Sequence, residues 1–437
     1  MLLQVYSFVL LVIPSDVTLG KISGALFPAG IIGMLAFGWW MAAILFGLHD
    51  PRNYPNPARL SFFVLWACSL ISYAFLAITV SLPVEVRAGD RWLIQLCAWT
   101  GVAMVAAESL NSMRDFHAVI RALVWGGAVC GFVASLQFWV NLDLAVYLRW
   151  IPGFSLNAEN LGIDSRASLN RVAGTAIHPI ELGVVAATVL PLAIFNGLYD
   201  KDRSPARRSI PVVLIIAAIP VSVSRSAILA AVVSLGLLLA SLKARQRTFG
   251  LLAIPVAVAA FFLTAPGLIG TFRDFFGQGT NEPSAAARQK DIPLVEKLVR
   301  EHPWFGRGGG SYAPVNPLDN LDNQYYRMLI ELGIVGTVLI TAAYLIAPAV
   351  IAFVARKRCT SESSRTLGAA LGGSAAASAL VAFTFDSLGF PMYAGLIALI
   401  IGMIGAYWRL ARAEERSAHD PAAGAPAPLC PIPPRTR

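Results

Sequence analysis

The stretch that decides the fold begins with polar residues and continues as an apolar run: Asp322-Asn323-Gln324-Tyr325-Tyr326-Arg327-Met328-Leu329-Ile330-Glu331-Leu332-Gly333-Ile334-Val335-Gly336. The apolar run continues to about residue 354, and an α-helix needs roughly 20 apolar residues to cross a bilayer. The polar residues before it end the one long polar stretch of the chain, which starts at Ala265. We therefore expect a membrane helix that starts beside a water-exposed segment, where chemistry on a soluble substrate is possible.

The composition of the whole chain predicts a polytopic membrane protein. Hydrophobic residues make up 57% of the 437 residues and charged residues only 14%, whereas an ordinary soluble domain is about 25% charged. The apolar runs do not alternate with polar residues, which argues against a transmembrane barrel. We predict an all-α integral membrane protein with about twelve transmembrane helices, near residues 2–14, 24–47, 60–82, 93–110, 118–139, 176–198, 209–223, 226–242, 248–265, 326–354, 367–385 and 388–408.

Basic residues collect in every second connection between these predicted helices, as in the group Lys201, Arg203, Arg207 and Arg208. By the positive-inside rule this pattern places both termini in the cytoplasm. We interpret the net charge of +9 as a signal of orientation and expect no nucleic-acid partner.

The chain divides into four predicted parts. Residues 1–265 hold helices one to nine, including an outer connection at 141–175; residues 266–325 form a large periplasmic loop domain with short helices; residues 326–408 hold the last three helices; residues 409–437 form a disordered cytoplasmic tail rich in Ala and Pro. The five cysteines fall in the helices or on the cytoplasmic side, and no metal-ligand spacing is evident. We therefore predict no disulfide framework, no metal and no cofactor.

Two arginines are predicted on the outer face. Arg171 precedes Gly174-Thr175 and His178-Pro179 at the start of the sixth predicted helix, where an arginine is either an interfacial anchor or a ligand. Arg225 lies in the short outer turn Ser224-Arg225-Ser226-Ala227, and no carboxylate is near it in sequence. The planar guanidinium fork suits phosphate oxygens, so two outer arginines suggest a diphosphate ligand.

The large loop carries a third pattern. Residues Ile292–Val299 place Leu294, Val295, Leu298 and Val299 at helical spacing, which predicts an amphipathic helix on the membrane surface. The run from His302 to Tyr312 follows, with Gly308-Gly309-Gly310 in it. Such a triplet is either a flexible turn or a nest of amides for an anion.

Together these patterns resemble the O-antigen ligase and polymerase superfamily of membrane glycosyltransferases. The resemblance is carried by Arg171 with Gly174-Thr175 and His178-Pro179, by the Ser224-Arg225-Ser226-Ala227 turn, by His302-Pro303-Trp304-Phe305-Gly306, and by Asp322-Asn323 ahead of Gly333-Ile334-Val335-Gly336. It implies a GT-C-like fold with the large periplasmic loop between helices nine and ten. It also implies a bacterial inner-membrane location with a periplasmic active site.

The activity that the resemblance implies is glycan transfer from an undecaprenyl-diphosphate-linked oligosaccharide, without a metal, in surface polysaccharide biosynthesis. The family's two diphosphate-binding arginines fall on Arg171 and Arg225. The histidine that the family uses as presumed base, in a His-Asn pair, is replaced here by Asp322. The acceptor is a second glycan, a lipid A core or a protein hydroxyl.

From these motifs we take Asp322, Arg225, Arg171 and His302 as candidate catalytic residues. Asp322 is the first candidate for the general base and His302 the second; an Asp in front of an apolar helix is also a common helix cap. Candidates for substrate binding are Arg288, Arg307, Asn323, Tyr325 and His178.

A transporter or flippase of a lipid-linked or anionic solute is the alternative function. Transporters usually place ionisable groups near the bilayer midplane, in broken helices. This chain concentrates them in its outer loops, which favours chemistry at the surface.

Overall fold

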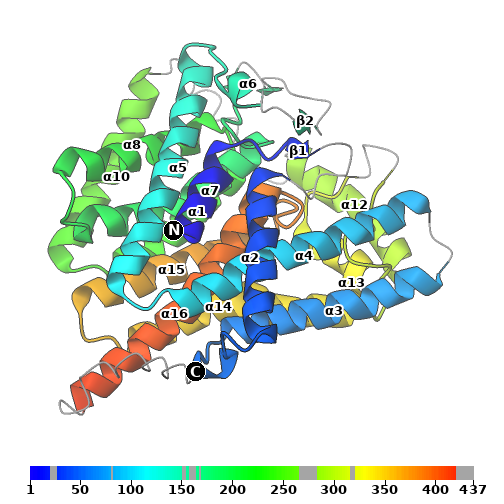
Figure 1. The fold of residues 1–437 in the computed structure, drawn as a ribbon. Coiled ribbons are helices and arrows are strands. Elements are labelled where there is room, and N and C mark those ends of the chain that lie inside the picture. The colour runs from blue at the N-terminus through cyan, green and yellow to red at the C-terminus, as the bar shows by residue number, and fades with distance from the viewer. Residues whose placement is uncertain are drawn as a thin grey trace, which may run out of the picture.

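The computed structural model describes residues 1–19, 27–79, 82–149, 154–156, 164–166, 169–264, 283–314 and 320–419. Long helices dominate this part of the chain (Figure 1). In chain order they are α1 (Leu2–Val12), α2 (Pro28–Leu45), α3 (Ala58–Ile78), α4 (Pro83–Ser109), α5 (Met113–Trp139), α7 (Pro179–Tyr199), α8 (Pro205–Val221), α9 (Arg225–Ser241), α10 (Ala244–Thr264), α12 (Pro283–Glu301), α13 (Gln324–Ile340), α14 (Ala347–Arg356), α15 (Glu362–Val381) and α16 (Pro391–His419).

Shorter elements connect these helices. They are the single-turn helices η1 (Pro51–Asn53) and α6 (Ala145–Leu148), the π-helical turn η4 (Thr341–Ile346) between α13 and α14, and the strands β1 (Val17–Leu19), β2 (Phe154–Leu156), β3 (Asp164–Arg166) and β4 (Leu169–Arg171). The strands form two antiparallel pairs, β1 with β2 and β3 with β4.

Each predicted membrane span coincides with one of the long helices. Within the residues that the structure describes, six helical segments are long and apolar enough to cross a membrane: α2, α3, α5, α7, the segment from α13 to α14, and α16. The chain is therefore a helical membrane protein. The count of twelve spans and the GT-C-like arrangement remain predictions.

Two helices are longer than their apolar runs. Helix α4 begins at Pro83, in a polar region before the predicted span at 93–110, and the Glu85 carboxylate accepts the Leu82 N–H at 2.9 Å to cap it. Helix α16 continues to His419, beyond the predicted end at residue 408. The first part of the predicted disordered tail is thus helical, and residues 420–437 lie outside the described part of the chain.

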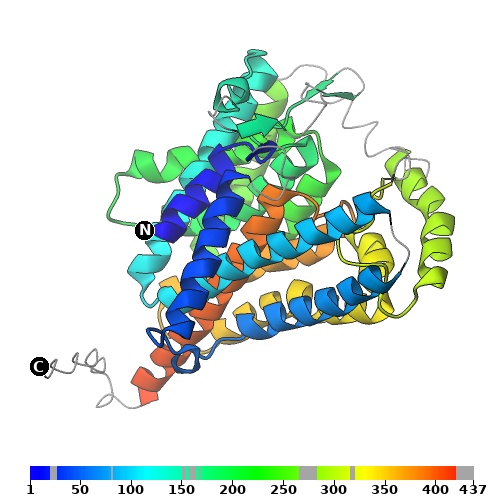
Figure 2. The same cartoon turned by 45° about the vertical axis from the view of Figure 1, so that its right-hand side comes forward.

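Helices α7 and α16 form the centre of the molecule. Of their most apolar 18-residue windows, 78% and 83% is buried, against 22% for α2 at the periphery. Figures 1 and 2 show β1, β2, α6 and α12 gathered at one end of the long helices, and α12 lying across the ends of α3, α4 and α13. The candidate site is at this end, where α7, α9, α13 and α16 begin.

Helix α12 contains the amphipathic segment predicted at Ile292–Val299. Its apolar face packs on the start of α13, where Val295 forms a buried cluster with Leu321 and Ile330. The predicted helix is present, but its apolar face contacts protein, whereas the prediction placed that face on the membrane surface.

Candidate active site

The chain that carries Arg171 is fixed in place before α7 begins. Arg171 ends β4, pairs across the hairpin with Asp164 and is 8% exposed. Three residues later Gly174 turns the chain with a φ of +62°, a conformation that L side chains rarely adopt. Gln137 of α5 accepts the Gly174 N–H at 2.7 Å and donates to the Gly174 carbonyl at 3.2 Å. Arg171 is therefore attached to a rigid segment.

His178 has a structural role at the start of α7. Its Nδ1 accepts the Ile180 N–H at 3.1 Å, so it caps the helix, and Pro179 occupies the first helical position. Its ring lies 5.9 Å from the ring of Phe390, just before α16. The predicted ligand His178 is thus a helix cap beside the α15–α16 connection.

Glu181, in the first turn of α7, is a buried carboxylate that the sequence analysis did not select. It is fully buried, and it accepts N–H groups of Ile177 at 3.0 Å and of Tyr393 at 3.1 Å. These bonds join the starts of α7 and α16. The sequence did contain a signal for this residue, because a glutamate in the first turn of a helix, here after His-Pro, often accepts backbone N–H groups at the helix start.

The turn before α9 holds Arg225 in a strained position. Val223 has a φ of +45°, which is a true outlier for a β-branched residue and costs roughly 1–3 kcal/mol. Ser224 then caps α9 by accepting the Ala227 N–H at 3.4 Å, and Arg225, partly exposed, is the first helical residue. Backbone strain beside a cationic side chain is typical of functional sites.

The turn with Arg225 packs against the beginning of α7. A Cβ atom at Gly183 would lie 2.3 Å from Ser222 Oγ and 2.5 Å from Ala227 Cβ. Only a glycine permits this approach, so the residues on both sides of Arg225 contact the first turns of the helix that follows Arg171. The structure thus places both arginines at the same end of the bundle.

The start of α13 is capped by Asn323. Its Oδ1 accepts the N–H groups of Tyr325 at 2.9 Å and of Tyr326 at 3.3 Å. The cap is therefore one residue after Asp322, which is exposed. Tyr325 donates its hydroxyl to the Ala379 carbonyl at 2.7 Å.

Gln324 joins the start of α13 to the α15–α16 connection. Its N–H donates to the Ala382 carbonyl at 2.9 Å, and its Oε1 accepts the Leu388 N–H at 2.7 Å. The same connection carries Phe390, which contacts His178. The residues from 382 to 390 therefore lie between the Asp322 segment and the start of α7.

A partly buried ion-pair network begins about one helical turn after Asp322. Arg327 donates to Glu331 at 2.9 Å and to the Tyr312 carbonyl at 3.3 Å, and it forms a second ion pair with Asp386. The Glu331 side chain is 2% exposed and also accepts the Gly310 N–H at 2.9 Å. The sequence analysis selected none of these three charged residues for the site, although an arginine and a glutamate spaced i, i+4 in an apolar helix were a signal.

The loop after α12 forms backbone hydrogen bonds with α13 on both sides of a break in that helix. Gly333 leaves the helical conformation with a φ of +68°. Before the break, the carbonyls of Ile330 and Glu331 accept the N–H groups of Arg307 at 3.1 Å and Gly308 at 3.0 Å.

After the break, the N–H groups of Ile334 and Val335 donate to the carbonyls of Pro303 at 2.8 Å and Trp304 at 3.3 Å. The motifs 302–306 and 333–336 are therefore one structural unit.

The remaining candidate residues lie in the loop after α12 and in α12 itself, and their contacts differ. Arg307 forms an ion pair with Glu85 at 3.2 Å. The glycine triplet directs two amides at protein groups, Gly308 at Ser72 Oγ (2.9 Å) and Gly310 at the Glu331 carboxylate. His302 is partly exposed at the start of this loop. The side chain of Arg288, in α12, lies outside the described residues.

The arrangement is suited to an anionic ligand. The starts of α7, α9 and α13 lie at one end of the molecule, and a helix N-terminus attracts anions through its free amides and its dipole. Across the described ranges no group of three or more His, Cys, Asp or Glu side chains is arranged to hold a metal.

Comparison with known proteins agrees with these features. Residues 210–341 match the family model described as O-antigen ligase. This segment runs from α8 into the end of α13 and includes Arg225 and Asp322. No curated protein matches the chain. The match supports a glycan-transferring role in the membrane, and over residues 210–341 the chain is similar to the O-antigen ligase family.

Proposed function

We propose that this protein transfers or polymerises a glycan from an undecaprenyl-diphosphate-linked donor onto an acceptor hydroxyl at the periplasmic face of the bacterial inner membrane. The observation that carries the proposal is the packing of the Arg225 turn on the start of α7, through Gly183, at the end of the bundle where Arg171 enters. Two guanidinium groups at one end of the helices suit a pyrophosphate leaving group.

In the reaction the acceptor oxygen attacks the anomeric carbon of the donor sugar. The bond between that carbon and the diphosphate oxygen breaks, and polyprenyl diphosphate leaves with the electron pair. Arg171 and Arg225 stabilise the charge that grows on the diphosphate in the transition state. In other enzymes a divalent cation supplies the same stabilisation, so the proposal includes metal-independent transfer.

The proton of the acceptor hydroxyl passes to a general base. Asp322 is the first candidate because it is exposed, whereas Asn323 beside it provides the helix cap. His302 is the second candidate, at the start of the loop that is joined to α13.

The remaining candidates are assigned to substrate contacts. Arg288, Arg307, Asn323, Tyr325 and His178 would then border the donor or acceptor site. The acceptor is a second lipid-linked glycan, a lipid A core or a protein hydroxyl. Both termini lie in the cytoplasm in this proposal. The connections that are rich in lysine and arginine also face the cytoplasm.

The test is a transfer assay with the full-length protein in detergent. Purified protein is incubated with a polyprenyl-diphosphate oligosaccharide and an acceptor glycan, with and without a chelator, and the products are separated by mass. We expect a longer glycan and free polyprenyl diphosphate at equal rates in both samples. The transporter alternative would be established by two results together: no product with or without the chelator, and movement of intact donor across the membrane of vesicles that contain the protein.

A further inference from the structure

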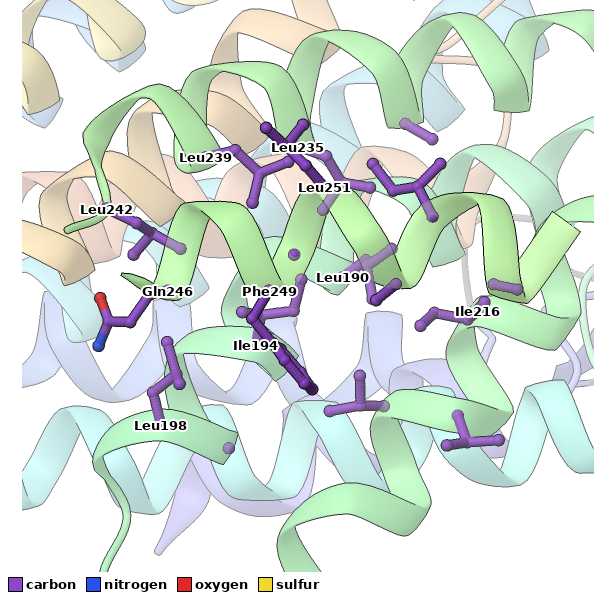
Figure 3. Close-up of a pocket in the computed structure, with 18 of the residues that line it drawn as sticks. Leu190, Ile194, Leu198, Ile216, Leu235, Leu239, Leu242, Gln246, Phe249 and Leu251 are labelled. Carbon is purple, nitrogen blue, oxygen red and sulfur yellow. The ribbon is translucent and has the colours of Figure 1, made fainter. Parts of the chain in front are cut away.

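A large cavity lies between α7, α8, α9 and α10. Its volume is about 1850 Å³, and Figure 3 shows that its labelled lining residues are almost all leucine, isoleucine and phenylalanine. Pockets for drug-sized ligands measure roughly 300–1,000 Å³. The cavity is thus too large and too apolar for a small polar solute.

The two ends of the cavity differ in charge. The end near the α8–α9 turn is lined by Ile219, Pro220 and Ile228. The opposite end is lined by Arg208, Lys243, Arg245 and Gln246, together with one carboxylate, Glu362. Three cations against one anion give this end a net charge of +2, and the arginine and lysine side chains are those that bind phosphate.

Buried polar atoms at this end have no partner among the described residues. Arg208 donates from Nη1 to the Gly197 carbonyl at 3.3 Å, but its buried Nε has no acceptor within the described part of the chain. The buried Oε1 of Gln246 has no donor there either. A buried polar group without a partner is costly, so a ligand with its own acceptors and donors fits here.

We propose that this cavity binds a phospholipid with an anionic headgroup, its acyl chains between α7, α8, α9 and α10 and its phosphate at Arg208, Lys243 and Arg245. Basic pockets between membrane helices are typical sites for acidic lipids. The proposal is independent of the transferase function.

The dimensions agree with an acyl chain. Along α9 the lining runs from Ile228 to Leu242, which at 1.5 Å per residue is about 21 Å. Half of a hydrocarbon core is about 15 Å. A chain that starts at the basic end therefore passes the bilayer midplane without leaving the cavity.

The position of the charged lining residues distinguishes an acidic phospholipid from the polyprenyl-linked donor. The diphosphate of the donor would lie near Arg225, at the end lined by Ile219 and Ile228, where the cavity has no charged lining residue. All charged lining residues are at the other end, beside the α9–α10 connection. Charge complementarity therefore favours an acidic phospholipid over the polyprenyl tail of the donor.

The lipid would also support α10. Phe249, Leu251 and Ile254 of this helix line the cavity and are 77%, 53% and 42% exposed. Ile194 of α7 also lines the cavity, and Figure 3 shows it together with Phe249 among the lining side chains. Acyl chains in the cavity would contact both helices and hold α10 against the bundle.

Native mass spectrometry of the full-length protein tests the proposal, with phosphatidylglycerol and phosphatidylcholine of identical acyl chains. The test variant is Arg208→Glu/Arg245→Glu, and its matched control is Arg207→Glu/Arg247→Glu, whose arginines are on the same helices but do not line the cavity. We expect wild type and control to prefer phosphatidylglycerol at least about tenfold. The test variant should lose roughly thirtyfold in affinity for it.

A second variant blocks the acyl site without changing the charge. A Cβ at Gly236, which lines the cavity, meets no atom within 4 Å. Gly236→Phe should therefore fold and lower phosphatidylglycerol binding at least tenfold. Gly38→Phe on α2, also without neighbours within 4 Å, should not.

Three results would overturn the proposal. Equal binding of both lipids excludes an anionic headgroup site. Unchanged phosphatidylglycerol binding in both test variants excludes the cavity. Displacement by a polyprenyl phosphate, with no effect of the charge reversal, assigns the cavity to the donor.

Discussion

Gly306 and Gly333 each lie against the backbone of the other's segment. A Cβ at Gly306 would be 2.2 Å from the Glu331 carbonyl oxygen, and a Cβ at Gly333 would be 2.4 Å from the Trp304 carbonyl carbon. Both glycines also have a positive φ, +73° and +68°. The outer loop and the broken helix therefore depend on the same two positions.

Replacing either glycine with alanine should destabilise the protein. Gly306→Ala and Gly333→Ala each introduce a backbone clash and a left-handed alanine, and we expect a loss of about 2–4 kcal/mol. The measurement is the apparent melting temperature in detergent by intrinsic fluorescence. Gly38→Ala is the control, because its Cβ meets no atom within 4 Å. The double variant should lose less than the sum of the two; strict additivity would mean that the two sites are independent.

Loss of Arg327 should destabilise the protein more than loss of its partner Asp386. Arg327→Met leaves the carboxylate of Glu331, 2% exposed, without its cation, and we expect a cost of about 3–5 kcal/mol. Asp386→Asn removes a partner whose side chain is 12% exposed, and it should cost less. The double variant Arg327→Met/Glu331→Gln should regain part of the melting temperature. A double variant less stable than Arg327→Met would show that the Glu331 charge is stabilised by other groups.

Loss of either outer arginine should abolish glycan transfer. Arg171→Ala and Arg225→Ala each remove a guanidinium from the proposed diphosphate site, and we expect initial rates to fall by about 10²–10³. Arg247→Ala, on α10 at the other end of the bundle, should keep its rate. The check is product formation at equal amounts of folded protein, as judged by size-exclusion chromatography. Wild-type rates in either outer variant would rule out the diphosphate clamp.

If Asp322 is the general base, two substitutions at this position should have different transfer rates. Asp322→Asn should lose roughly 10²–10⁴ in transfer rate, whereas Asp322→His keeps a proton acceptor and should lose far less. Asn323→Asp should keep its rate and its stability, because aspartate is an equally good helix cap. Rates are compared under single-turnover conditions. Equal rates for Asp322→Asn and Asp322→His would show that the carboxylate takes no proton.

The buried Asp16 predicts a pH dependence of stability. Asp16 is 1% exposed and forms an ion pair with Arg149 at 2.9 Å. Burial raises the pKa of Asp16, and the opposing effect of Arg149 does not cancel this. A carboxyl whose pKa is higher in the folded than in the unfolded state binds its proton more tightly when folded, so its contribution to stability falls as the pH rises through this window.

Wild type should therefore gain stability relative to Asp16→Asn as the pH falls from neutral toward the ordinary aspartate pKa. The measurement is the difference in melting temperature between the two proteins across this range. The comparison cancels the titration of groups that do not interact with Asp16. A difference that moves in favour of Asp16→Asn on acidification would show that the ion pair with Arg149 outweighs burial.

The membrane helices could be predicted because their signal is local. An apolar run of about 20 residues has one stable form in lipid, in which each N–H bonds within its own helix. The boundaries of α4 and α16 were less accurate, since their polar ends are stabilised by capping and packing. The amphipathic segment of α12 was also readable, because its apolar residues repeat with the helical period.

The pairings within the candidate site could not be predicted in the same way. Arg327 and Asp386 are 59 residues apart, and nothing in either local pattern indicates the other. The sequence separated the motifs at 302–306 and 333–336, although their backbones bond to each other. It also suggested a cap at Asp322, whereas the side chain of Asn323 makes both bonds. Local propensity cannot distinguish two adjacent capping residues.

The break at Gly333 has a mechanical consequence. Residues 303–308 supply hydrogen-bond partners for the backbone groups of α13 that the break leaves without a helical partner. This part of the outer loop is therefore fixed to a membrane helix. Helix α12 ends only one residue before this anchor, at Glu301. Because Val295 of α12 also packs against Leu321 and Ile330, α12 and the loop after it are both held to the start of α13.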